Sequence, residues 1–264
     1  MKTGFFAFVL LATSGAWTCA ADIAWPAKGK KAAIVLTYDD ALRSQLEFAV
    51  PQLDAASLRG TFFLDGDLSP DQMLLWRKVA ARGHELANHS MFHPCPRAML
   101  PDRRNYFADN YDVARMLEEI AAMNNVLFGI DGKQSRTFSV PCSQTRVGNE
   151  DYTEPLRRSG LIRFVRTGGD QWNGVITDFA KLDVFRTPSY GPVDEPDAAK
   201  LIDFAERVRN AGGLGVFQFH GVGGDYLKVS AQAHQALVEY LRAHPDIWVG
   251  TFQEVMDYVS ARTR

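Results

Sequence analysis

The sequence contains a continuous apolar stretch, Ala32-Ala33-Ile34-Val35-Leu36-Thr37-Tyr38, which is followed at once by Asp39-Asp40. Such a run is typical of a strand that is buried on both faces, as in a parallel sheet. Parallel strands need a crossover connection, which is usually a helix. The stretch therefore predicts an α/β fold and places two carboxylates where a central strand ends.

The rest of the chain alternates short apolar segments with segments of helical periodicity. Further strands are expected at 60–64, 84–88, 137–141, 161–166, 183–187, 214–219 and 247–250. Helices are expected between them, and capping boxes at Ser69–Gln72 and Thr251–Glu254 predict the start of two of these helices. This alternation implies parallel strands with helical crossovers, hence a barrel or a doubly wound sheet.

Composition limits the classes of function. The chain has 264 residues, is 46% hydrophobic and carries a formal net charge of -2, which suits one large domain or two small ones. Barrels of the α/β class with this length are commonly single domains. A charge near zero gives no reason to expect nucleic acid or an anionic membrane as partner. No glycine-rich nucleotide motif follows any expected strand, which disfavours a nucleotide site.

The first 20 residues have the pattern of an export signal. Lys2 is followed by an apolar segment at 4–13 and by small residues at Thr18-Cys19-Ala20. We expect a signal peptide at 1–20, a single catalytic domain at 21–264, and a periplasmic or secreted protein. The apolar run is too short to span a bilayer comfortably, so no stable membrane insertion is expected after cleavage. A buried N-terminal helix is the alternative.

Two histidines, His89 and His93, stand four residues apart after the expected strand at 84–88. Pro94 disfavours a helical conformation at His93, so the pair is expected on a turn that leaves a strand. Neutral imidazoles at this spacing can bind one metal ion. The alternative is a pair of surface or core histidines.

Asp39-Asp40, the two histidines and His220 all follow expected strands, whose carboxyl ends share one face in parallel α/β folds. Asp40, His89 and His93 form a two-nitrogen, one-oxygen set that suits zinc and that cobalt, nickel or iron could also fill. A metal-bound water, a free carboxylate at Asp39 and a proton donor at His220 would together suit hydrolysis of an amide or ester.

Three motifs carry a resemblance to a known family: Thr37-Tyr38-Asp39-Asp40, His89-Ser90-Met91-Phe92-His93 and Phe219-His220. In order and spacing they resemble those of the polysaccharide deacetylases (NodB-like, carbohydrate esterase family 4), from about residue 34 to 258. The resemblance implies an incomplete (β/α) barrel of about seven strands. It also implies removal of N- or O-acetyl groups from a carbohydrate, in which a metal-bound water attacks the acetyl carbonyl. By the same resemblance Asp39 is the base, His220 the acid, and Asp40, His89 and His93 the metal ligands.

The chain departs from the family at the fourth expected strand, Phe138-Ser139-Val140-Pro141-Cys142. Pro141 is in place, but the arginine that steadies the base is missing and Cys142 stands where an aromatic residue would be. Arg166, at the end of the next strand, could reach Asp39 instead. Asp170-Gln171-Trp172 is a poorly placed substitute for the family's Asp-Trp motif. Pro141, Arg166 and Trp172 are candidate substrate-binding residues.

Cys95 and Cys142 would remain in an exported chain, and an oxidising compartment permits a disulfide between them. A zinc-binding role and buried free thiols are the alternatives. His234 is expected at the surface. Tyr190 and Tyr226 are expected in loops on the active face, where packing in the core or the loop is favoured over contact with a sugar ring.

Two other functions compete with the deacetylase hypothesis. One is a carbohydrate-binding pseudo-enzyme of the same fold, which the altered arginine motif favours. The other is an iron(II) oxygenase with a two-histidine, one-carboxylate site, which would leave Asp39 and His220 without a role. The identity of the acetylated glycan, the native metal and the oligomeric state are not readable from the residues.

Overall fold

The structure is a computed structural model that describes residues 23–26, 29–100, 106–168 and 174–263. The expected signal peptide and the segment Asp170-Gln171-Trp172 lie outside the described residues. Seven strands form one sheet: β1 (Ala32–Asp39), β2 (Thr61–Leu64), β3 (Glu85–Asn88), β4 (Thr137–Ser139), β7 (Phe164–Arg166), β8 (Leu214–Phe219) and β9 (Ile247–Gly250). Two short strands, β5 (Arg146–Val147) and β6 (Glu150–Asp151), form a separate hairpin.

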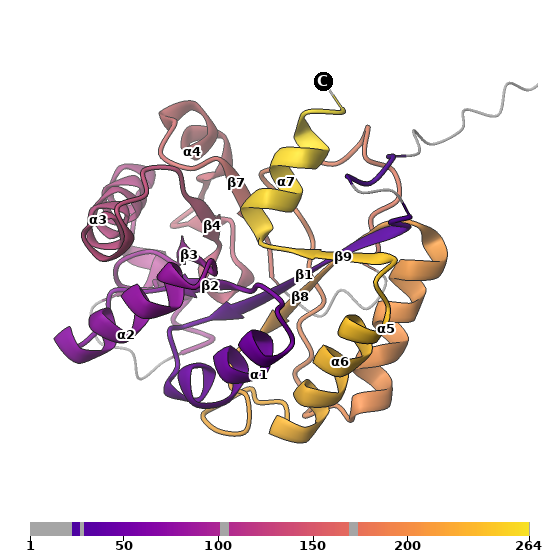
Figure 1. Cartoon of the computed structure of the whole chain (residues 1–264). Coiled ribbons are helices and arrows are strands. Elements are labelled where there is room, and N and C mark those ends of the chain that lie inside the picture. The colour runs from indigo at the N-terminus through magenta and orange to yellow at the C-terminus, as the bar shows by residue number, and fades with distance from the viewer. Residues whose placement is uncertain (1–22, 27–28, 101–105, 169–173, 264) are drawn as a thin grey trace, which may run out of the picture.

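Helices connect and cover these strands (Figure 1). The α-helices are α1 (Val50–Ala55), α2 (Pro70–Ala81), α3 (Val113–Asp131), α4 (Thr153–Ser159), α5 (Ala198–Ala211), α6 (Ala231–Ala243) and α7 (Phe252–Ser260). A π-helical turn η1 (Gln45–Ala49) precedes α1, and the short 3-10 turns are η2 (Ala108–Asn110) and η3 (Pro141–Ser143).

The sheet is parallel throughout and has the order β7-β4-β3-β2-β1-β8. On the side of β1 away from β8, β9 pairs with residues 32–35 and β2 pairs with residues 37–39. The curled sheet with its helical crossovers confirms the expected incomplete (β/α) barrel of about seven strands.

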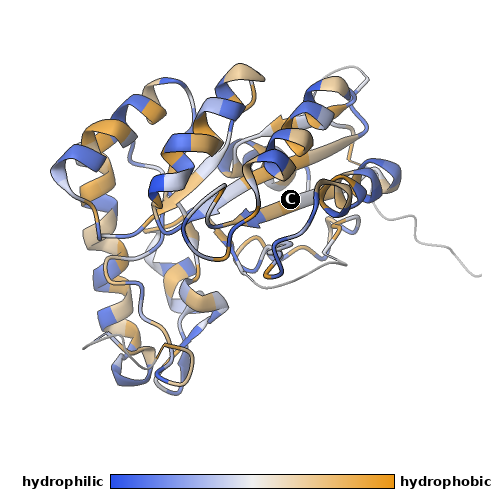
Figure 2. Ribbon diagram, turned by 90° about the horizontal axis from the view of Figure 1, so that it is seen from below, coloured by the Kyte–Doolittle hydropathy of each residue, from blue (hydrophilic) through white to orange (hydrophobic). Residues whose placement is uncertain are grey.

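The two faces of β1 are buried in different clusters. Ile34, Leu36 and Tyr38 pack with residues of α1, α2, α5 and α6, on what we call the outer face. Ala33 and Val35 pack with α7 and with Trp25, on the inner face. In Figure 2 the helices that flank the sheet alternate between hydrophilic and hydrophobic residues along their length. Because side chains alternate along a strand, residue parity decides which face each one reaches.

Local sequence signals set several element boundaries. Both expected capping boxes are confirmed at Ser69 and Thr251, the residues before α2 and α7. The expected strand at 183–187 is wrong. The Arg186 amide bonds to the Asp183 carbonyl and the Asp183 side chain accepts from the Phe185 amide, which makes a turn. Only an isolated bridge between Thr187 and Arg166 remains.

His234, expected at the surface, and Tyr190, expected in a loop, are both fully buried. His234 places Nε2 2.7 Å from the Tyr38 hydroxyl and Nδ1 against Gln52. Burial lowers the pKa of His234 to about 3, so the ring is neutral. Tyr190 packs among Phe204 and Phe217 in the outer-face core, not on the active face.

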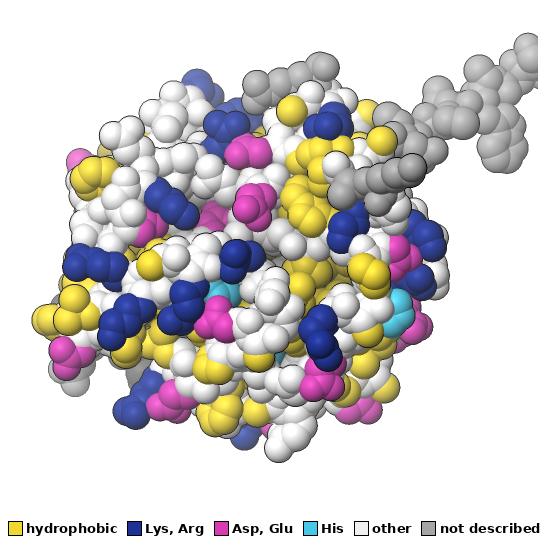
Figure 3. All heavy atoms as spheres, viewed as in Figure 1, with side chains coloured by type: hydrophobic (Ala, Val, Ile, Leu, Met, Phe, Trp, Pro, Cys, Tyr) yellow, Lys and Arg dark blue, Asp and Glu magenta, His cyan; other side chains and the backbone are white. Residues whose placement is uncertain are grey.

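The surface shows no face of a single charge in the view of Figure 3, where basic and acidic side chains are interspersed. This fits the net charge of -2. Within the described part of the chain, no helix combines the length and apolarity needed to cross a membrane.

Cys95 and Cys142 form a disulfide, with their Cα atoms 5.6 Å apart. The bond joins the segment that follows β3 to the turn that follows β4 across a sequence separation of 47 residues. It therefore links the segments that follow the carboxyl ends of the neighbouring strands β3 and β4.

Reduction of this disulfide is expected to destabilise the protein. Freeing a loop of this length increases the entropy of the unfolded chain, which corresponds to about 4 kcal/mol in the loop-closure model. Urea unfolding with and without a phosphine reductant measures the change. The double variant Cys95→Ser, Cys142→Ser should match the reduced wild type and should not respond to the reductant. An unchanged unfolding midpoint on reduction would contradict the expectation.

Candidate metal centre and active site

The alternation of side chains along each strand directs one set of polar side chains to the inner face of the sheet. Val35 lies on this face, and so does Asp39, four residues further along β1. By the same alternation Arg166 follows Phe164 on β7 and Gln218 follows Val216 on β8. His89, just past β3, continues the parity of Ala87. The carboxyl ends of four parallel strands therefore bring these side chains together.

Asp40, His89 and His93 converge on one point. The two Nε2 atoms of His89 and His93 are 3.1 Å apart, and Asp40 Oδ1 lies 3.2 Å from the first and 3.3 Å from the second. Ligands about 2.0–2.2 Å from a tetrahedral ion stand roughly 3.4 Å from one another. The spacing thus fits a single small cation among the three atoms.

The hydrogen bonding supports this fit. His89 Nδ1 lies 2.9 Å from the carbonyl oxygen and 2.6 Å from the hydroxyl of Ser139, so Nδ1–H donates there and Nε2 keeps its lone pair. Asp40 Oδ1 is buried and has no hydrogen-bond donor among the described residues. A carboxylate oxygen and an imidazole lone pair that face each other repel unless a cation lies between them.

The pKa shifts of the site residues also favour a bound cation. Burial alone would raise the pKa of Asp40, but His89, His93 and His220 hold it well below its usual value. Burial alone would lower the pKa of His89, yet Asp39 and Asp40 raise it. These directions apply to the protein without a metal. They show that the cluster attracts positive charge, which a proton or a metal ion can supply.

A tight turn positions the two histidines, as their sequence context predicted. The Ser90 amide donates to the Asn88 side chain, and the His93 amide donates to the Ser90 hydroxyl. Ser90 and His93 have φ values of +66° and +48°, a region that non-glycine residues seldom occupy. No helix forms between β3 and Cys95, consistent with Pro94.

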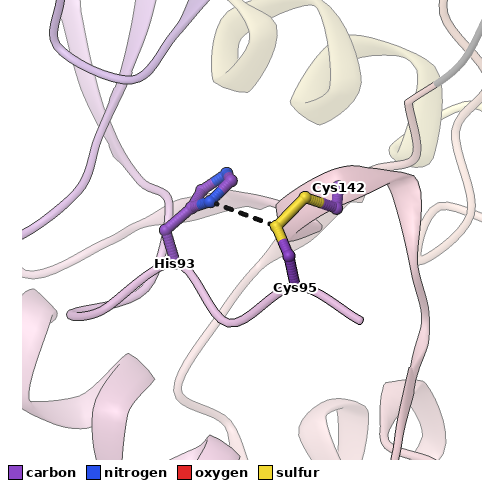
Figure 4. A group of neighbouring side chains, drawn as sticks. All are labelled: His93, Cys95 and Cys142. Carbon is purple, nitrogen blue, oxygen red and sulfur yellow. Dashed lines mark hydrogen bonds between the residues drawn. A yellow bond between two sulfur atoms is a disulfide. The ribbon is translucent and has the colours of Figure 1, made fainter. Parts of the chain in front are cut away.

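The disulfide lies directly against one member of the trio. Figure 4 shows a ring nitrogen of His93 directed at Cys95 Sγ, while the disulfide bond to Cys142 runs away from the ring. His93 Nδ1 lies 3.5 Å from Cys95 Sγ. His93, Cys95 and Cys142 also lie close enough to form a metal-ligand set. Because both sulfurs are bonded to each other, the structure favours the disulfide over the zinc-binding and free-thiol alternatives.

Asp39 lies beside the trio and is held by a guanidinium. Arg166 Nη2 donates to both carboxylate oxygens of Asp39, at 2.6 and 2.5 Å, and Gln218 Nε2 donates to Oδ2 at 3.0 Å. Arg166 is fully buried and also bonds to the Ser189 hydroxyl. The contact anticipated between Arg166 and Asp39 is therefore present, from β7 and not from β4. Asp39 Oδ2 lies 4.0 Å from His89 Nε2.

His220 follows β8 and reaches the other oxygen of Asp40. Its Nε2 lies 3.8 Å from Asp40 Oδ2, and its side chain is 17% exposed. The Gln45 side-chain amide donates to the carbonyl oxygens of both Asp39 and His220, which ties the ends of β1 and β8 together. Tyr226, which is 53% exposed, donates its hydroxyl to Asp40 Oδ2 at 2.8 Å.

The three candidate substrate-binding residues differ in position. Pro141 is buried in the turn η3 after β4, where Cys142 has a φ of +51°. Arg166 is turned inward onto Asp39, and Trp172 lies outside the described residues. Contact between these residues and substrate stays a prediction.

Sequence reasoning missed four polar residues that support the site: Gln45, Ser139, Ser189 and Gln218. Gln218 could have been found, because it is a lone polar residue in an apolar strand two positions before His220. Ser189 and Gln45 lie in irregular or π-helical segments, where sequence periodicity gives no orientation.

Known proteins share the sequence and the fold. The profile of the polysaccharide deacetylase family matches residues 27–160, just over half of the chain. Two curated Bacillus subtilis (strain 168) proteins also match. Uncharacterized protein YlxY is 41% identical over 49 residues, which cover 19% of this chain and 15% of YlxY. Peptidoglycan-N-acetylmuramic acid deacetylase PdaA is 28% identical over 113 residues, which cover 42% of this chain and 38% of PdaA.

Solved structures extend the likeness over most of the chain. A Mycobacterium smegmatis protein classed with the polysaccharide deacetylases aligns with a TM-score of 0.66 and 19% identity, covering 93% of this chain and 95% of its own. The structure of Bacillus subtilis PdaA, a family 4 carbohydrate esterase, aligns with a TM-score of 0.55 and 17% identity, covering 86% and 81%. At these identities the structural likeness establishes the fold, while the sequence profile establishes the family. This chain belongs to the polysaccharide deacetylase family.

Proposed function

We propose that this protein is a metal-dependent hydrolase that removes N- or O-acetyl groups from a carbohydrate. One observation carries the proposal: Asp40, His89 and His93 place three ligand atoms 3.1–3.3 Å apart beside a second carboxylate, Asp39. Membership of the polysaccharide deacetylase family supports the reaction class and an acetylated carbohydrate as substrate.

A divalent metal bound by Asp40, His89 and His93 would lower the pKa of a bound water towards about 7 and polarise a carbonyl oxygen. Zinc is the first choice, because two imidazoles and one carboxylate leave a position open. Cobalt, nickel or iron(II) suit the same donor set.

The proposed base is Asp39, which takes a proton from the attacking water. Arg166 and Gln218 fix its orientation, and the guanidinium compensates the cost of burying its charge. Arg166 thus takes over the task of the missing motif arginine. This contact argues against the pseudo-enzyme alternative, which the altered arginine motif had favoured.

The proposed acid is His220, which donates a proton to the nitrogen or oxygen of the sugar as it leaves the acetyl group. Its partial exposure lets a substrate approach it. An oxygenase would give neither Asp39 nor His220 a task, so the arrangement favours hydrolysis.

We further propose that the protein acts after export. The pattern at 1–20 and the Cys95–Cys142 disulfide support a periplasmic or secreted location.

Acetate release tests the proposed function. The metal-reconstituted protein, incubated with acetylated peptidoglycan, chitin oligomers and acetylated xylan, should release acetate from at least one. A chelator should stop the release, and re-addition of zinc should restore it. Consumption of oxygen without acetate release would instead indicate the oxygenase.

Replacement of either histidine ligand should remove metal and activity together. His89→Ala or His93→Ala is expected to lower zinc affinity by more than about 100-fold, since loss of an outer-shell partner already costs 10–100-fold. Zinc content after gel filtration and acetate release are the two measurements. His244→Ala, at the end of α6, is the control. Normal zinc content in His89→Ala or His93→Ala would refute the ligand assignment.

Replacement of Asp39 should separate metal binding from turnover. Asp39→Asn keeps the shape and accepts a hydrogen bond, but cannot take the proton, so kcat should fall roughly 10²–10⁴-fold while zinc stays bound. Circular dichroism controls for folding, because Arg166 loses its buried counter-charge. Near-normal turnover would remove Asp39 as the base.

A further inference from the structure

Asp40 uses its two carboxylate oxygens differently. Oδ1 faces Nε2 of both His89 and His93, at 3.2 and 3.3 Å, and is the oxygen that would bind a metal ion. Oδ2 points the other way and accepts the hydroxyl of Tyr226 at 2.8 Å. A hydrogen-bond donor from outside the family motifs therefore occupies the oxygen that the metal site does not need.

The segment that carries Tyr226 is anchored on both sides. The Tyr226 carbonyl accepts the Gly221 amide at 3.1 Å, and the Asp225 side chain accepts the Ser44 amide at 2.8 Å. Ser44 Oγ in turn accepts the Val222 amide at 3.2 Å. The segment is thus fixed to the start of η1, close to the end of β1 that bears Asp40.

The backbone around Tyr226 is held in a rare conformation. Asp225 and Leu227 have φ values of +60° and +43°. Such conformations persist where the surroundings determine them, and they concentrate at functional sites. Here they direct an aromatic ring that is 53% exposed to turn its hydroxyl inward, onto a carboxylate that is 8% exposed.

We infer that Tyr226 is a positioning residue that holds Asp40 in one-oxygen contact with the metal. This inference rests on the metal site of the proposed function. Carboxylates can bind a cation through one oxygen or two. With Oδ2 engaged by a phenol, Asp40 offers Oδ1 alone, which leaves the open positions that water and substrate require.

The same hydrogen bond affects the proposed acid. His220 Nε2 lies 3.8 Å from Asp40 Oδ2, too far for a hydrogen bond, and its ring centroid lies 6.3 Å from that of Tyr226. Because the phenol satisfies Oδ2, His220 is not drawn into a bond with the metal ligand. It stays available to the leaving group.

Three full-length variants test the role of the hydroxyl. Tyr226→Phe removes the hydroxyl and keeps the ring, while Tyr226→Leu removes both. Tyr258→Phe is the matched control, because its hydroxyl bonds to the Ala24 carbonyl, remote from the site. Zinc affinity is measured by competition with a chromophoric chelator. The absorption spectrum of the cobalt(II)-loaded protein reports coordination geometry, and kcat and KM are measured separately.

Tyr226→Phe is expected to weaken zinc binding about ten-fold, as loss of an outer-shell partner does, and to change the cobalt spectrum. It should lower kcat and leave KM unchanged, because the ring remains. Tyr226→Leu should lose the same zinc affinity, and Tyr258→Phe should match the wild type.

Zinc affinity and a cobalt spectrum equal to wild type in Tyr226→Phe would overturn the inference. So would a loss confined to Tyr226→Leu, which would assign the effect to the ring. If the hydroxyl alters zinc affinity but the wild type releases no acetate from any acetylated glycan, the proposed function fails and the positioning role stands.

Discussion

The burial of two adjacent carboxylates at the end of β1 is the constraint on which the rest of the site depends. Asp39 is 1% exposed and the side chain of Asp40 is 8% exposed. An unpaired buried charge costs several kcal/mol, so each carboxylate needs a cation. Asp39 obtains the guanidinium of Arg166, itself fully buried. Asp40 faces two imidazoles, and the three side chains form a candidate metal-ligand group.

Backbone strain is concentrated around the same carboxyl ends. Asp40, Ser90, His93 and Cys142 all have φ between +48° and +74°. Each such residue is unfavourable by itself and persists because its neighbours determine it. The Cys95–Cys142 disulfide joins two of these segments, which follow neighbouring strands of the parallel sheet. Connections held in this way suit the candidate metal site, where three ligand atoms lie 3.1–3.3 Å apart.

Much of the site follows from the alternation of side chains between the two faces of each strand, which can be read from the sequence once the strands are predicted. The buried strand at 32–38 that leads into Asp39-Asp40 and the turn at His89–His93 are confirmed. Gln218 was within reach of the same reasoning. The strand expected at 183–187 and the surface position expected for His234 were wrong. Hydrogen bonds to Asp183 form a turn where the apolar pattern had predicted a strand. His234 is buried because its ring pairs with the Tyr38 hydroxyl, a contact that the helical pattern around it does not reveal.

The sequence by itself determined the fold class, the order of the motifs and the residues of the candidate metal-ligand group, because hydrophobic periodicity and motif spacing are local properties. Tertiary structure decided which partner each of these residues has. Arg166, and not a residue of β4, holds Asp39, and the Tyr226 hydroxyl reaches Asp40 across 186 residues of sequence. The physical reason is that two side chains can pair only if the strand ends or loops that carry them lie close together in space. Those distances are fixed only when the sheet has formed and curled.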